Sequence, residues 1–274
     1  MSQVAASDVA SSARLGRLGE ILAHSSYMVG RQTRNLFREP IWIAMMLVQP
    51  MFWLLLYSQL FRRLVELPGF ETDSYIDFLA PAVVIMTAFF QGTWSGMGMI
   101  TDLDRGVIER FLATPARRSA LVFSQVLRSG LTSVIQGVII LAVSLVLGAE
   151  NGGPVGWLVI MLAGGLVSAG FAGISQGVAL ITRREATMIA VANFIGLPLM
   201  FFSAMLIDFD LIPRWMQWAA RFNPVQWAVD AAREPVLASP DWSLVGLSML
   251  LLAAFVVATT GFATWAFRAY QRTL

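Results

Sequence analysis

The chain has 274 residues, of which 57% are hydrophobic and 13% are charged, with a formal net charge of +2. This composition excludes an ordinary soluble domain. The absence of cysteine excludes disulfides and thiolate metal sites, and the absence of lysine excludes the phosphate-binding loop of a P-loop ATPase. The basic residues flank apolar runs, where they set membrane orientation, so no nucleic-acid partner is expected.

Apolar runs dominate the sequence and recur six times. Each is about 20 residues long, which at 1.5 Å per helical residue crosses a hydrocarbon core of about 30 Å. The sequence therefore predicts an all-α, polytopic membrane protein with a six-span transmembrane domain over residues 40–274. The predicted spans cover residues 41–60, 78–100, 129–147, 155–181, 186–207 and 243–267.

The chain before the first span divides into two parts. Residues 1–14 are small and polar, and we expect them to be disordered. Residues 15–39 mix arginines with apolar residues at helical spacing and are too polar to span, so we expect a helix in the cytoplasmic interface. The first 40 residues contain no apolar stretch with a small-residue cleavage site, so no removable signal peptide is expected.

A charged loop, residues 101–120, separates the second and third spans. It is too polar for hydrocarbon, and its excess of arginine places it in the cytoplasm. Residues 106–114 have an amphipathic helical pattern that ends at Thr114 and Pro115. A short helix held between two spans in this way could transmit a push from a soluble partner.

Two features distinguish the second half of the chain. The fourth span is rich in glycine, which lets neighbouring helices approach closely. Residues 212–238 are rich in tryptophan, and Asn223 followed by Pro224 is a helix start signal. We therefore expect short outer helices in the interface, with Asp230 and Arg233 as an i,i+3 structural pair.

The distribution of arginine supports this topology. Thirteen of the arginines fall on the side that carries both predicted cytoplasmic termini, and Arg128 lies at the membrane edge. The other side carries Arg62, Arg63, Arg214, Arg221 and Arg233. This excess satisfies the positive-inside rule.

Three features resemble the membrane (permease) subunit of type 2 ABC exporters, the group that contains drug-resistance and polysaccharide-export permeases. One is RGVIERFLATPARRSALVFSQVL over residues 105–127, another is FNPVQWAVDAAREPV over residues 222–236, and the third is the order of the predicted elements. The chain departs from the pattern at Phe202, Ser203 and Ala204, where many relatives have Ser-Gly.

The resemblance implies a transport subunit without an ATPase, catalytic or metal site of its own. ATP and Mg would be bound by a separate ATPase subunit, present in two copies beneath a homodimer of this chain in the bacterial inner membrane. The residues implied to couple this chain to the ATPase are Arg105, Val107, Ile108, Glu109, Arg110 and Phe111.

The resemblance also implies a substrate pathway between two copies, along the second and fifth spans. Its aromatic and methionine side chains would suit an amphiphilic drug or lipid-like substrate, with Gln91 and Asn193 adding hydrogen bonds. The implied pathway residues are Phe89, Phe90, Gln91, Trp94, Asn193, Phe194, Met200, Phe201 and Met205.

Alternatives remain open at this point. A permease for a lipid-linked polysaccharide would have the same fold. A membrane-embedded enzyme would need catalytic groups within the spans, but the one histidine, His24, precedes them and no Gly-x-Ser-x-Gly motif is present. A scaffold or receptor would have no ATPase gene beside its own.

Overall fold

The computed structural model describes residues 40–61, 74–108, 118–150, 152–205, 209, 212–237 and 239–272. Throughout these ranges the regular structure is helical, which confirms the predicted all-α class for this part of the chain. The helices are α2 (Pro40–Leu60), α3 (Tyr75–Asp104), α5 (Arg118–Val146), α6 (Gly153–Thr182), α7 (Glu185–Phe201), α8 (Arg214–Ala220), α9 (Pro224–Arg233), the 3-10 helix η3 (Glu234–Val236) and α10 (Trp242–Gln271).

Four of the described helices are long and apolar enough to cross a membrane. They are α3, α5 over Leu121–Val146, α6 and α10. The apolar helix α7 has 17 residues and ends at Phe201, short of the predicted span end at residue 207. The six-span count therefore stays a prediction, whereas the multi-span character of the chain is established. The predicted interfacial helix of residues 15–39 lies outside the described residues.

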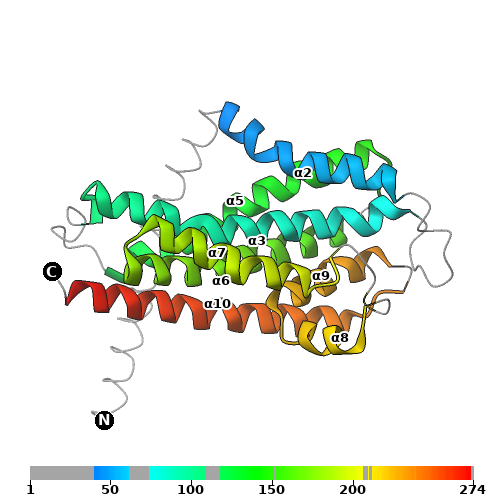
Figure 1. The fold of residues 1–274 in the computed structure, drawn as a ribbon. Coiled ribbons are helices and arrows are strands. Elements are labelled where there is room, and N and C mark those ends of the chain that lie inside the picture. Colours follow the sequence, from blue (N-terminus) through cyan, green and yellow to red (C-terminus); the bar gives the residue numbers. More distant parts are fainter. Residues whose placement is uncertain are drawn as a thin grey trace, which may run out of the picture.

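The long helices lie side by side, and the connections between them alternate between two ends of the bundle (Figure 1). One end carries the end of α3, the turn between α6 and α7 and the end of α10, and we call it the C-terminal end. The other carries α8, α9 and the start of α10, and we call it the α9 end. This alternation agrees with the topology that the arginine distribution predicts.

Helix α6 is the centre of the bundle, and α3, α5 and α10 pack around it. Glycine makes these approaches possible. A Cβ added at Gly92 of α3 would lie 2.4 Å from the carbonyl oxygen of Ser168, and one at Gly173 of α6 would lie 2.8 Å from the backbone of Thr259. Such distances leave no room for a side chain, so the predicted close packing of the glycine-rich span is confirmed.

Serine hydroxyls join the same helices through hydrogen bonds. The Oγ atoms of Ser129 and Ser168 lie 3.0 Å apart between α5 and α6, and Ser133 Oγ donates to the carbonyl oxygen of Gly164 at 3.2 Å. Between α3 and α6, Ser175 Oγ donates to the carbonyl oxygen of Thr93 at 2.6 Å. Small polar side chains therefore pair across the tight contacts that glycine allows.

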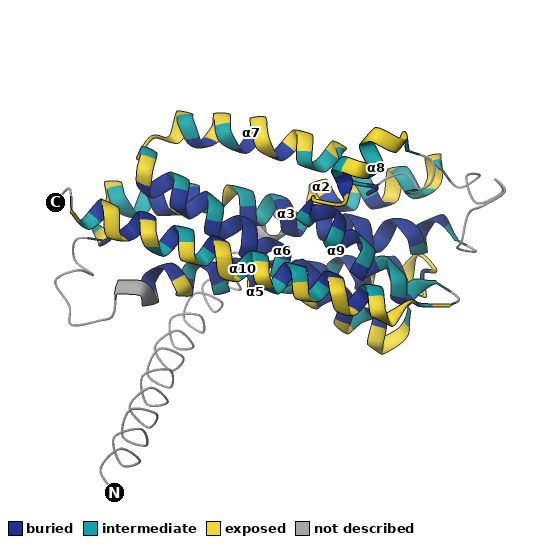
Figure 2. Cartoon of the chain, turned by 90° about the horizontal axis from the view of Figure 1, so that it is seen from below, coloured by how far each residue is buried: buried dark blue, intermediate teal, exposed yellow. Residues whose placement is uncertain are grey.

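Helix α7 packs much less closely than the others. Its buried residues are Met188, Ala192 and Gly196, which form a single stripe at a spacing of four. The opposite side is exposed, as the yellow surface of α7 in Figure 2 shows, and Phe194 is 83% exposed. A partner or lipid must cover this apolar side.

The contact between α3 and α6 gives a direct test. We expect Gly92→Ala to lower the free energy of unfolding by about 1–3 kcal/mol, because the new methyl group would clash with the backbone at Ser168. Thermal unfolding in detergent measures the change. The matched control is Gly98→Ala on the same helix, where a Cβ meets nothing within 4 Å and alanine favours the helix. Equal melting temperatures for the two variants would contradict this packing.

Candidate functional site

The first half of the predicted coupling segment is described, and it starts directly after α3. Arg105 and Gly106 form a turn, with Gly106 at a φ of 64°, and Val107 and Ile108 are helical again. The described residues stop there, so the predicted contacts of Glu109, Arg110 and Phe111 lie outside them. We refer to Arg105, Gly106, Val107 and Ile108 as the 105–108 segment.

The side chains of this segment point in different directions. Arg105 is exposed and Val107 is 42% exposed, so both can meet a partner. Ile108 is 1% exposed and packs within its own chain. In this structure the side chain of Ile108 therefore anchors the segment to the bundle, and its predicted contact with an ATPase stays a prediction.

Ile108 belongs to a buried apolar cluster at the C-terminal end, which we call the C-terminal cluster. The cluster contains Ile108 together with residues of α3, α5, α6, α7 and α10. Its buried members are Met99, Ile100, Ile108, Leu121, Val122, Val126, Ala169, Ala179, Leu180, Met188, Ala263, Ala266, Phe267 and Tyr270. The 105–108 segment is therefore packed into an apolar cluster to which five helices contribute.

At the C-terminal end, polar contacts connect α3 to α5 and the end of α6 to α10. Gln125 Nε2 of α5 donates to Asp102 Oδ2 of α3 at 3.2 Å. The guanidinium of Arg183, after α6, lies 4.6 Å above the ring of Tyr270 in α10. These contacts favour movement of the helices as units instead of one at a time.

The predicted pathway residues differ in how far the structure exposes them. Phe89 and Met205 are buried, with exposed fractions of 0% and 2%, and cannot contact a substrate on the outer surface. Phe90, Gln91 and Met200 are partly buried. The exposed residues are Trp94, Asn193, Phe194 and Phe201. Of the predicted pathway residues, these four have the most exposed side chains.

Phe89 lies instead in the wall of an apolar cavity between α3, α6, α7 and α10. The ring of Phe89 packs edge-on against the ring of Phe171, with 4.7 Å between the ring centroids. Sequence reasoning missed Phe171, together with Ile174 of α6 and Phe255 of α10. The sequence held no signal for them, because α7 is apolar around most of its circumference and only the structure shows that Met188, Ala192 and Gly196 face inward.

At the α9 end, Asn223 connects α7 to α9. Its Oδ1 accepts from the backbone N–H of Val225 at 3.0 Å, which confirms the predicted N-cap. Its Nδ2 donates to the carbonyl oxygens of Leu199 at 2.7 Å and Phe202 at 3.3 Å, at the end of α7. One buried side chain therefore fixes where α7 stops and α9 begins.

Arg233 and Gln226 extend this connection. The guanidinium of Arg233 donates to the carbonyl oxygens of Ala204 and Met205, and lies 3.6 Å above the ring of Phe78 in α3. Gln226 Oε1 accepts from the backbone N–H of Ala204 at 2.7 Å. The segment after α7 is thereby held by side chains of α9, at the place where the sequence lacks the Ser-Gly of many relatives.

Asp230 completes this network. Gln226 Nε2 donates to Asp230 Oδ1 at 2.6 Å. Burial raises the pKa of Asp230 to about 6, and the Gln226 hydrogen bond and the charge of Arg233 offset part of that rise. Asp230 is thus close to titration near neutral pH.

Asn223 is tested by two substitutions. Asn223→Ala should cost about 1–3 kcal/mol of unfolding free energy, because the cap and both bonds to α7 are lost. Asn223→Asp keeps the cap acceptor but cannot donate to α7. The backbone amides of residues 199–203 should exchange their hydrogens faster in both variants. The amides of the first turn of α9 should exchange faster in the alanine variant alone. Unchanged exchange at residues 199–203 would contradict the connection.

Asp230 gives a pH dependence of known sign. Its carboxyl titrates near 3.8 when unfolded and near 6 when folded, so the folded state binds the proton more tightly. The unfolding free energy should therefore fall as the pH rises from about 4 to about 6. Above pH 6 it should stay at this lower value. Asp230→Asn should remove this fall and gain about 3 kcal/mol at pH 7.5. A variant with the wild-type pH profile would contradict the assignment.

Comparison with known proteins gives consistent matches. The profile of the family described as ABC-2 type transporter matches residues 25–237. The chain is 27% identical over 226 residues to the transport permease ycf38 of Porphyra purpurea, covering 82% of this chain and 77% of the relative. It is 26% identical over 223 residues to the daunorubicin resistance ABC transporter permease protein DrrB1 of Streptomyces coeruleorubidus, covering 79% and 76%.

Proposed function

The chain belongs to the ABC-2 type transporter family, and from this premise we propose that it is the membrane subunit of an ATP-driven exporter. The observation that carries the proposal is the anchored 105–108 segment. It presents Arg105 and Val107 outward and fixes Ile108 in a cluster shared by five helices. This is the arrangement that a mechanical link to a soluble motor needs.

In the proposed cycle, two separate ATPase subunits bind ATP and Mg beneath two copies of this chain. Their closure pushes on the coupling segment, with Glu109, Arg110 and Phe111 as further contacts. The C-terminal cluster passes the push to the long helices, which tilt as rigid bodies between inward-open and outward-open states. The side of the ATPase would be the cytoplasm, with both termini on it.

The exposed side of α7 supports pairing with a second copy. Phe194 and Phe201 are 83% and 62% exposed, on a helix that buries a single stripe. Exposed apolar surface of this kind marks a contact with protein or lipid. The substrate would pass between the copies along the exposed pathway residues Trp94, Asn193, Phe194 and Phe201.

We propose an amphiphilic drug or lipid-like compound as the substrate. Three of the four exposed pathway residues, Trp94, Phe194 and Phe201, are aromatic, which supports this, and one relative is named for daunorubicin resistance. A lipid-linked polysaccharide is the second candidate, because the ABC-2 family match applies equally to it. Transport into vesicles of a daunorubicin-like cation, compared with a lipid-linked oligosaccharide, distinguishes the two.

Coupling to the ATPase is tested by co-purification with the ATPase encoded beside the gene. Glu109→Arg and Phe111→Asp should each weaken retention of the ATPase by about tenfold or more, because both place a wrong charge or polarity in the contact. The matched control is Glu150→Arg, a charge reversal at an exposed residue of the opposite end. If no ATPase associates with the wild type, or if both variants retain it with unchanged turnover, the exporter proposal fails.

A further inference from the structure

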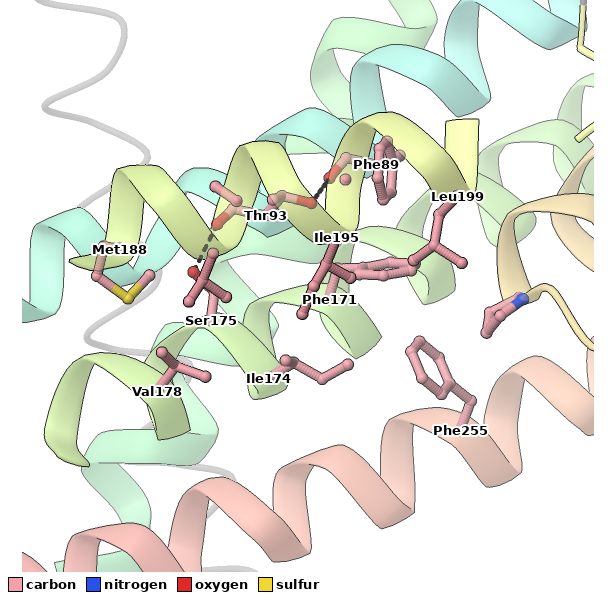
Figure 3. Close-up of a pocket in the computed structure, with 14 residues that line it drawn as sticks. Phe89, Thr93, Phe171, Ile174, Ser175, Val178, Met188, Ile195, Leu199 and Phe255 are labelled. Atoms are coloured by element: carbon pink, nitrogen blue, oxygen red, sulfur yellow. Dashed lines mark hydrogen bonds between the residues drawn. The ribbon is translucent and has the colours of Figure 1, made fainter. Parts of the chain in front are cut away.

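The cavity beside Phe89 has a volume of about 220 Å³ and lies between α3, α6, α7 and α10, and Pro224 of α9 also belongs to its lining. Figure 3 shows side chains from α6, α7 and α10 directed at this common space. The remaining lining residues are Phe89, Thr93, Phe171, Ile174, Ser175, Val178, Met188, Val191, Ala192, Ile195, Gly196, Leu199 and Phe255.

The lining carries no charged residue, and its hydroxyl groups are already hydrogen-bonded. Thr93 Oγ1 donates to the carbonyl oxygen of Phe89 at 2.8 Å. Ser175 Oγ donates to the carbonyl oxygen of Thr93 at 2.6 Å and accepts from the N–H of Gly96 at 3.0 Å. The cavity therefore offers nothing to bind a polar head group or ordered water, and its chemistry selects a purely apolar ligand.

The size also suits such a ligand. Engineered apolar cavities of about 150 Å³ stay dry and bind benzene or xenon, so a space of about 220 Å³ can hold several methylene groups. An empty cavity costs its lining atoms their dispersion contacts on one side, and an alkyl chain would restore them. Occupation is therefore favourable.

The way in lies between α7 and α10, which do not pack closely against each other. Ile195 lines the cavity and is also 47% exposed, so the lining continues to the outer surface there. Helix α10 is apolar enough to cross a membrane, and its side chains Leu250 and Val257 are 67% and 74% exposed. Where such a helix crosses a bilayer, the apolar ligand available to it is the hydrocarbon of the lipids.

We propose that this cavity binds one alkyl chain of a membrane lipid, which enters sideways between α7 and α10 past Ile195. The site lies within a single copy of the chain, apart from the proposed pathway between two copies. The proposal does not depend on the ATPase or on the transported substrate, and binding can be measured without either.

The test uses the purified chain in phosphatidylcholine vesicles that contain a phosphatidylcholine with a photoreactive diazirine in one acyl chain. After illumination, peptide mapping should find the label on Phe171 and Ile174, inside the cavity, as well as on the outward Val257. The label on Val257 serves as the internal standard, because it reports a folded chain in the bilayer. Label on Val257 with none on Phe171 or Ile174 would overturn the proposal.

Filling the cavity gives the second readout. A Cβ at Gly196 meets only ordinary contacts, the nearest at 3.6 Å from Phe89, so Gly196→Leu extends into the cavity. It should lower the labelling of Phe171 and Ile174, relative to Val257, by about tenfold or more. The matched control Gly246→Leu places the same side chain in open space on α10 and should change nothing. If Gly196→Leu does not fold, Ala192→Val places a smaller added side chain on the same side of the cavity. Unchanged labelling in a folded filling variant overturns the proposal.

A second arm identifies the source of the alkyl chain. A photoreactive single-chain alkyl amphiphile is added to vesicles of unlabelled phosphatidylcholine. If this amphiphile labels Phe171 while the diazirine phospholipid does not, the cavity holds the tail of a soluble amphiphile, and the lipid proposal is wrong. Labelling by the phospholipid in the absence of any amphiphile supports it.

Discussion

The close backbone approach of α6 to its neighbours is the constraint on which the rest of the structure depends. Gly92 of α3 and Gly173 of α6 leave no space for a side chain at their contacts, and serine hydroxyls pair across the same surfaces. In hydrocarbon there is no hydrophobic force between helices, so such packing and hydrogen bonding must hold them together. In the proposed cycle, a bundle that is this tight around α6 would move as a unit.

The two ends of the bundle act on this core in different ways. At the C-terminal end, Ile108 anchors an exposed segment in a cluster shared by five helices. At the α9 end, Asn223 and Arg233 hold the backbone after α7. Helix α7 is thus fixed at its two ends and loosely packed between them, which leaves it as the element whose sides face a second copy, a lipid or the substrate.

The sequence predicted the helical class, the glycine-mediated packing and the cap at Asn223, because periodicity, small residues and turn chemistry are local signals. It did not give the direction in which the side chains of a helix point. The pattern around Ile108 shows an apolar position, but it does not distinguish burial in the chain's own bundle from burial in a partner. Helix α7 is apolar on all sides, so its composition could not separate the outward Phe194 from the inward Gly196; tertiary packing decides both.

Site-specific photocrosslinking at two adjacent positions tests the central claim most directly. A photoreactive amino acid is placed at Val107, which is exposed, or at Ile108, which is buried in the C-terminal cluster, in the complex with the ATPase. The account predicts that the Val107 probe crosslinks to the ATPase, whereas the Ile108 probe crosslinks within its own chain. Crosslinking of the Ile108 probe to the ATPase, or of neither probe to it, would contradict the anchored coupling segment.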